Sequence, residues 1–192
     1  MPRIQFLVYI LLLASLQQPC LCQQTFKVIP ATLPAAEGAS VNVLLLELDK
    51  AQFSLRVPNG YGTQVTEENR SIVFTAEDNT CTITLRVTTN FPGALPKPEV
   101  LSGFVARKYP QASLLQTSPC VSDYGPGLCF DLTQPGPNGL SLHIRDAFVP
   151  YPAGSFEFIF SCNGVDYDQK RLSFAWLLNS FRSQPKSAKN NS

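Results

Sequence analysis

Apolar and polar side chains alternate strictly along two segments of the chain. The first is residues 80–88, where Cys81, Ile83, Leu85 and Val87 are separated by threonines and an arginine. The second is Ser155–Cys162, where every second residue is apolar: Phe156, Phe158, Phe160 and Cys162. A period of two places such side chains on one face of a β-strand. Both segments are therefore predicted to be half-buried strands, each pointing one cysteine into the core.

Similar runs recur along the chain, separated by turn signals such as Pro58-Asn59-Gly60. They predict strands at Phe26–Ile29, Ser40–Leu48, Gln52–Val57, Arg70–Thr75, Val100–Ala106, Leu140–Ile144 and Leu172–Leu178. The segment Tyr109–Gln116 is ambiguous and admits a short helix. Many short strands with regular turns are typical of an all-β sandwich. The predicted fold is an all-β, disulfide-stapled antiparallel β-sandwich with at most one short helix.

The first 22 residues have the features of a cleaved signal peptide. Arg3 precedes an apolar run over 6–16, and small residues, Cys20 and Cys22, precede a cleavage point before Gln23. The run is shorter than the roughly 20 residues that a membrane-spanning helix needs. The mature protein is therefore predicted to be secreted and extracellular, without a membrane span.

The remaining chain is predicted to form a single β-sandwich-like unit over 23–182, followed by a polar, disordered tail over 183–192. A segment rich in proline and glycine at 90–98 is a candidate sub-boundary. One cysteine precedes this segment and three follow it after the signal peptide, so full pairing would require one disulfide to cross it. This arithmetic favours one covalently tied unit over two domains.

Export makes disulfides the expected state of Cys81, Cys120, Cys129 and Cys162. Four cysteines allow three pairings. The shared inward face of the two alternating strands favours Cys81–Cys162 as a bond between facing walls of the sandwich. Cys120–Cys129 would then close a short loop through Gly125-Pro126-Gly127. The alternative, a zinc site, lacks the closely spaced cysteine pairs that such sites use, and no metal or other cofactor is predicted.

The net charge of the mature chain limits the kinds of partner that the protein is expected to bind. The chain has 15 basic and 14 acidic residues. One basic residue, Arg3, lies in the predicted signal peptide, so the mature chain would have 14 of each and no formal net charge. A neutral chain lacks the basic excess typical of nucleic-acid-binding proteins. An extracellular protein or glycan is the predicted partner.

The sequence contains few of the residue patterns that are typical of catalytic sites. His143 is the only histidine, and Asp131 or Asp146 could orient it for a serine nucleophile. The chain has no Gly-x-Ser-x-Gly motif to present that serine, and His143 is interpreted as a surface residue of a strand. Asp166 and Asp168 are oxygen ligands two residues apart, but the twelve-residue calcium loop around them is missing. The protein is predicted not to be an enzyme.

Other residues indicate an extracellular binding role. Asn69-Arg70-Ser71 is an N-glycosylation sequon in a polar turn. Tyr124, inside the predicted Cys120–Cys129 loop, and Asn138, in the turn over 134–139, are the candidate partner contacts. The alternative is a structural, self-associating component of a matrix or coat, held by the exposed edges of Gln52–Val57 or Leu172–Leu178.

Overall fold

The computed structural model describes residues 25–34, 40–49, 51–123 and 125–184. In this part of the chain the elements are, in order, β1 (Phe26–Pro34), β2 (Ser40–Leu48), β3 (Ala51–Arg56), β4 (Tyr61–Thr66), β5 (Ser71–Ala76), β6 (Cys81–Thr88), α2 (Pro98–Lys108), β7 (Ser113–Ser122), β8 (Gly125–Pro135), the 3₁₀ turn η2 (Pro137–Gly139), β9 (Ser141–Tyr151), β10 (Gly154–Asn163), α3 (Tyr167–Ser180) and β11 (Arg182–Gln184). The predicted signal peptide lies outside the described residues.

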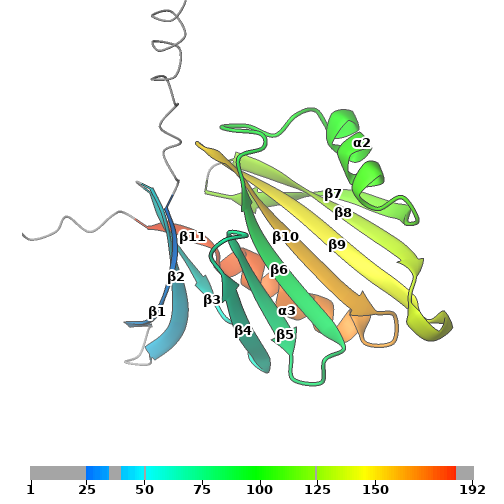
Figure 1. The fold of residues 1–192 in the computed structure, drawn as a ribbon, viewed down its shortest axis with the longest axis horizontal. Helices are drawn as coiled ribbons and strands as arrows, with labels where there is room; N and C mark the ends of the chain where they lie inside the picture. The colour runs from blue at the N-terminus through cyan, green and yellow to red at the C-terminus, as the bar shows by residue number, and fades with distance from the viewer. Residues whose placement is uncertain (1–24, 35–39, 50, 124, 185–192) are drawn as a thin grey trace, which may run out of the picture.

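The strands form two antiparallel sheets (Figure 1). The smaller has the order β1-β2-β3-β11 and the larger the order β4-β5-β6-β10-β9-β8-β7. The larger sheet takes strands from both sides of the candidate boundary at 90–98, since β6 pairs with β10. The predicted all-β class with antiparallel sheets is confirmed, and β2 has the predicted bounds.

The main core lies on one face of the large sheet. The inward residues of β10, Phe156, Phe158 and Phe160, are fully buried. They pack against the small sheet and α3, where the rings of Phe53 and Phe181 stack with centroids 5.3 Å apart. Full burial of one phenylalanine side chain is worth about 1.5–3 kcal/mol, so this aromatic layer is a major source of stability.

The helix α2 covers part of the opposite face of the same sheet, as Figure 1 shows. Its buried side chains, Leu101 and Val105, contact a second apolar cluster that contains Phe130 and Phe148 from β8 and β9. The large sheet is therefore covered on both sides near β8–β10, and polar groups placed there are cut off from water.

Two predicted strands are helices, and this corrects the sequence analysis. Val100–Ala106 lies in α2, which begins with Pro98 in its first turn and has Arg107 and Lys108 in its last, both favourable for a helix. Leu172–Leu178 lies in α3. The alternation there suggested a strand, but Phe174, Leu177, Leu178 and Phe181 are the buried residues. Their spacing follows the 3.6-residue period of a helix.

The hairpins also differ from prediction. The sequence analysis missed β4, and the ambiguous segment Tyr109–Gln116 contributes to β7 rather than to a helix. The predicted loop between Cys120 and Cys129 is mostly paired strand, because β7 and β8 form a hairpin with Cys120 opposite Gly127. β11 includes Ser183 and Gln184, which were assigned to the tail.

The Cys81–Cys162 disulfide is formed. The two residues are directly opposite each other on β6 and β10, which are neighbours in the large sheet. The predicted bond is therefore confirmed, but its setting was wrong: it joins two strands of one sheet rather than the facing walls of a sandwich. Both cysteines are buried, so the bond is enclosed in the main core.

Candidate functional site

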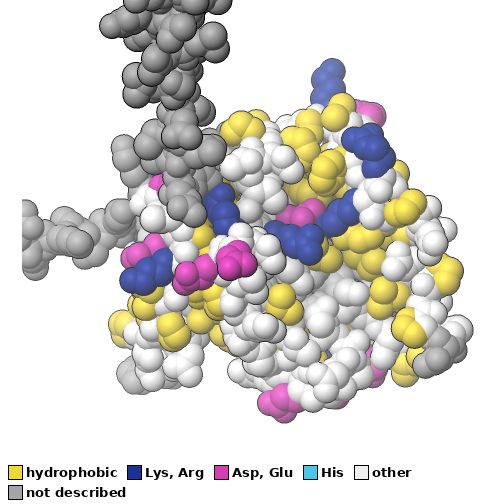
Figure 2. Space-filling view, in the orientation of Figure 1, with side chains coloured by type: hydrophobic (Ala, Val, Ile, Leu, Met, Phe, Trp, Pro, Cys, Tyr) yellow, Lys and Arg dark blue, Asp and Glu magenta, His cyan; other side chains and the backbone are white. Residues whose placement is uncertain are grey.

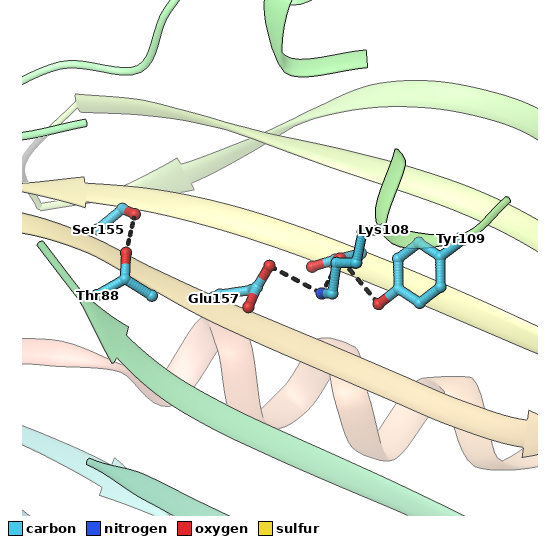
Figure 3. A network of polar contacts seen from close by, with 6 residues as sticks. Thr88, Lys108, Tyr109, Ser155 and Glu157 are labelled. Atoms are coloured by element: carbon cyan, nitrogen blue, oxygen red, sulfur yellow. Dashed lines mark hydrogen bonds and ion pairs between the residues drawn. The ribbon is translucent and has the colours of Figure 1, made fainter. Parts of the chain in front are cut away.

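A network of charged and polar side chains lies where α2 ends on the large sheet (Figure 3). The Lys108 ammonium is 2.7 Å from Asp146 Oδ2 on β9 and 2.8 Å from Glu157 Oε1 on β10. The Tyr109 hydroxyl donates to the same Asp146 oxygen at 3.0 Å. Asp146 and Glu157 lie on adjacent strands with their side chains on the same face of the sheet. One cation therefore bridges two carboxylates.

Burial controls the electrostatics of this network. The side chain of Asp146 is fully buried, that of Glu157 is 6% exposed, and that of Lys108 is 21% exposed. Loss of hydration and the nearby Glu157 charge outweigh Lys108 and raise the pKa of Asp146 to about 7. Burial and the Asp146 charge also raise the pKa of Tyr109. Asp146 Oδ1 is buried without a hydrogen-bond partner.

Figure 2 shows acidic and basic side chains gathered in the middle of this face of the molecule. The network joins the end of α2 to two sheet strands, and most of its atoms are out of reach of a large ligand. Its chemistry is suited to holding α2 in place and to responding to pH. In the sequence, Asp146 stands out only as a candidate partner of His143, and no motif there predicts a site at Lys108 or Glu157.

A second cluster lies on the opposite face, between the β7–β8 hairpin and α3. Arg145 on β9 is within 3.4 Å of Asp131 Oδ1 and donates to the Ser118 hydroxyl at 3.2 Å. The Cys120 thiol donates to the Phe148 carbonyl oxygen at 3.9 Å, and the neighbouring Cys120 and the Arg145 guanidinium lower the pKa of Cys129. The predicted Cys120–Cys129 disulfide is not formed in the structure, where both residues are free thiols in contact.

The outer side of α3 exposes a stripe of apolar side chains. Leu172 is 67% exposed and Trp176, one helical turn further on, is 45% exposed. The guanidinium of Arg56 lies 5.8 Å from the centre of the Trp176 ring, within range of a cation–π interaction. We call this region the α3 surface; it comprises Val121, Leu172, Ala175, Trp176 and Asn179, with Arg56, Arg171 and Arg182 at its margin.

His143 is half-buried, with its ring 4.7 Å from the ring of Tyr167. The two carboxylates considered as its partners bind elsewhere. Asp131 accepts a hydrogen bond from the Tyr167 hydroxyl and pairs with Arg145, and Asp146 bonds Lys108 on the opposite face. The catalytic arrangement considered for His143 is therefore not assembled.

Asp166 and Asp168 lie at the start of α3. Asp166 is the N-cap residue, and its main-chain carbonyl accepts from the amide of Lys170. The Asp168 carboxylate is 92% exposed and lies 3.3 Å from the Arg171 guanidinium. Among the described residues, no three His, Cys, Asp or Glu side chains gather closely enough to hold a metal ion.

The remaining predicted residues are distributed over separate loops. Asn69 is exposed in the turn between β4 and β5; its glycosylation stays a prediction. Tyr124 lies outside the described residues, and Asn138 is in η2. Gly125 and Pro135 mark the two ends of β8, roughly 35 Å apart at the usual rise per strand residue. The partner-contact roles of Tyr124 and Asn138 stay predictions.

The comparisons with known proteins show the fold alone. No family model matches the chain, and no curated protein sequence does. The solved structure of cyanobacterial PsbP from Synechocystis is similar with a TM-score of 0.53 and 12% identity, over 69% of this chain and 86% of that one. The yeast Ran-binding protein Mog1p has a TM-score of 0.47 and 10% identity, over 81% and 96%. LpqN of Mycobacterium tuberculosis, involved in cell envelope biogenesis, has 0.46 and 10%, over 82% and 92%.

None of the described helices is both long and apolar enough to cross a membrane.

Proposed function

We propose that the protein is a secreted, non-enzymatic binding protein that recognises a protein or glycan partner at a cell surface or in an extracellular coat. The observation that carries the proposal is the half-exposed Trp176 on the α3 surface, paired with Arg56. Tryptophan and arginine are enriched among the residues that dominate binding energy in protein interfaces. An apolar stripe next to such a pair matches that composition.

Charge indicates what the partner presents. Arg56 and Arg182 line the same hollow as Trp176. Arg171 is on the other side of the stripe, beside Leu172. Three arginines around an apolar stripe favour a partner with acidic groups next to an apolar or ring-shaped group. An acidic protein segment has these features, and so does a glycan that carries carboxylates.

The non-enzymatic part of the proposal is supported by the geometry around His143. Its candidate partners are engaged elsewhere, and the other strongly polar cluster, Lys108 with Asp146 and Glu157, is largely buried beneath α2. Secretion is supported by the N-terminal sequence pattern and by the buried disulfide, which is typical of proteins that fold in an oxidising compartment.

Cell binding tests this function. The mature chain, tetramerised to raise avidity, is applied to a panel of cells with and without surface protease or glycosidase treatment. Saturable binding is expected, and Trp176→Ala should weaken it by about thirtyfold, the effect of losing a strong interface residue. The matched control is Val100→Ala, which removes a side chain of similar exposure (59%) from α2 on the other face of the sheet.

The control variant should bind like the wild type. Equal binding by the Trp176 variant would exclude the α3 surface, and the absence of saturable binding to any cell would contradict the proposed function. Loss after protease treatment indicates a protein partner, and loss after glycosidase treatment alone indicates a glycan.

Self-association through sheet edges is the second candidate function. The edges predicted for it were wrong, since β3 lies between β2 and β11 and residues 172–178 are helical. The described edges of the large sheet are β4 and β7. β4 carries no charged or proline residue, and its residues 62–65 are exposed, so it lacks the usual protection against strand pairing. Concentration-dependent oligomers that Val65→Lys abolishes would favour this function; a strict monomer would exclude it.

A further inference from the structure

The two free thiols lie at a pocket between the β7–β8 hairpin and α3. Cys120, Cys129 and Arg145 line one side of it, and Arg171, Leu172 and Ala175 line the other. The cavity has a volume of about 390 Å³, enough for part of a tripeptide-sized molecule. Cys120 is partly exposed there, whereas Cys129 is only 1% exposed.

The hairpin register directs one thiol toward the other. Cys120 is opposite Gly127, and Cys129 follows Gly127 by two residues, so their side chains share a face. A Cβ atom at position 127 would lie 2.5 Å from Cys120 Sγ. The Cys120 side chain therefore extends over the space that the glycine leaves and reaches Cys129. The contact between the thiols depends on a glycine at this position.

The two sulfur atoms are not equivalent. The neighbouring Cys129 and burial raise the pKa of Cys120, whereas the neighbouring Cys120 lowers the pKa of Cys129. The guanidinium of Arg145 further favours a negative charge on Cys129. The Cys120 thiol donates to the Phe148 carbonyl oxygen at 3.9 Å, so the more exposed sulfur keeps its proton while the buried sulfur of Cys129 is the one that favours the thiolate.

We propose that Cys120 and Cys129 are a thiol–disulfide exchange pair, in which Cys120 takes a glutathionyl group from oxidised glutathione and Cys129 then displaces it. In the first step the Cys120 thiol loses its proton to a solvent base, and the Cys120 sulfur attacks the glutathione disulfide and releases one glutathione thiolate. In the second step Cys129 loses its proton to that thiolate and attacks Cys120 sulfur. The Cys120–Cys129 bond forms and the second glutathione leaves as a thiolate.

The sum of the two steps is balanced. The two thiols give up one proton to the solvent base and one to the first glutathione thiolate and are oxidised by two electrons, while oxidised glutathione is reduced to one thiol and one thiolate. The arginines at the pocket, Arg145 and Arg171, are suited to the carboxylates of glutathione. The pocket shares Leu172, Ala175 and Arg171 with the α3 surface, but this inference concerns sulfur chemistry and its test requires no binding partner.

The test starts from the full chain after mild reduction, with peptide mapping to establish that the buried Cys81–Cys162 bond is intact and that Cys120 and Cys129 are thiols. Oxidised glutathione is added, and quenched samples are analysed by intact mass and peptide mapping. The wild type should pass through an adduct on Cys120 and end with a Cys120–Cys129 bond. Cys129→Ser should accumulate the adduct on Cys120, and Cys120→Ser should form an adduct at least tenfold more slowly.

Two further results decide the proposal. Arg145→Gln should prolong the lifetime of the Cys120 adduct, because Cys129 loses the charge that favours its thiolate. A wild type that remains a dithiol, or an adduct that maps first to Cys129, would overturn the proposal. The wild-type time course gives this answer even where a variant fails to fold.

Discussion

Replacing Lys108 by methionine tests whether the charged network stabilises the fold by neutralising two buried carboxylates. Methionine keeps most of the apolar stem and removes the charge. Asp146 and Glu157 would then face each other with side-chain exposures of 0% and 6%. Removing one partner of a buried ion pair costs about 3–5 kcal/mol. Lys108 is itself 21% exposed, so water can partly replace it, and a loss of about 3 kcal/mol is expected at pH 8.

The loss of stability caused by Lys108→Met should be smaller at acidic pH. The pKa of Asp146 is already raised to about 7, and removal of the neighbouring cation raises it further. At pH 5 Asp146 is protonated in the folded variant, and a neutral carboxyl beside Glu157 no longer needs the ammonium. The expected loss at pH 5 is therefore about 1 kcal/mol, close to that of an ordinary hydrogen bond.

Urea unfolding of the disulfide-bonded protein at both pH values measures the two losses. The matched control is Arg107→Met, which removes an exposed cation from the preceding position of α2 and should leave the unfolding free energy nearly unchanged. Adding Asp146→Asn to the methionine variant should restore part of the stability at pH 8. A loss of the same size at pH 5 and pH 8, with no recovery in the double variant, would refute the reasoning.

Three other changes test the structure. Asp146→Asn alone should remove a pH dependence: the raised pKa of about 7 against 3.8 means that folding takes up a proton, so wild-type stability should increase from pH 8 to pH 5 by about 2.5 kcal/mol relative to the variant, and parallel curves would contradict the assignment. Replacing both Cys81 and Cys162 by alanine opens a bond that spans 81 residues and should cost about 4 kcal/mol in urea unfolding; a loss below about 1 kcal/mol would show that the bond contributes little. Gly154→Ala should cost about 3 kcal/mol or prevent folding, because its Cβ would overlap the carbonyl oxygen of Thr88. Gly62→Ala, with its nearest contact at 3.9 Å, should change the melting temperature little.

Secondary structure was predicted best from the sequence where the spacing of apolar residues followed only one period. In β6 and β10 the apolar residues alternate, and both segments are strands as predicted. β6 is half-buried, whereas the second face of β10 is also covered and buries Ser155 and Glu157. In α3 the same stretch satisfies two periods: Leu172, Phe174, Trp176 and Leu178 alternate, while Phe174, Leu177, Leu178 and Phe181 follow a helical period. Only the packing of the folded chain decides between the two periods. It follows the helical one and leaves Leu172 and Trp176 exposed.

The charged network was beyond sequence reasoning for a different reason. Lys108 is separated from Asp146 by 38 residues and from Glu157 by 49, and their meeting depends on where α2 is placed on the sheet. One local signal was present, since Glu157 stands between Phe156 and Phe158 in a strand of otherwise apolar character. A charge in that position on a covered sheet requires a partner.

Strand β9 connects the two polar systems of the molecule. Arg145 and Asp146 are adjacent in sequence, so their side chains lie on opposite faces of the sheet. Asp146 is covered by α2 and belongs to a network that few ligands can reach, which favours a role in stability and its dependence on pH. Arg145 is on the α3 side, beside the thiols and one end of the exposed stripe. Because one strand positions both, a change that shifts β9 should alter stability, thiol chemistry and partner binding together, whereas changes at Lys108 or Trp176 should affect only one of them.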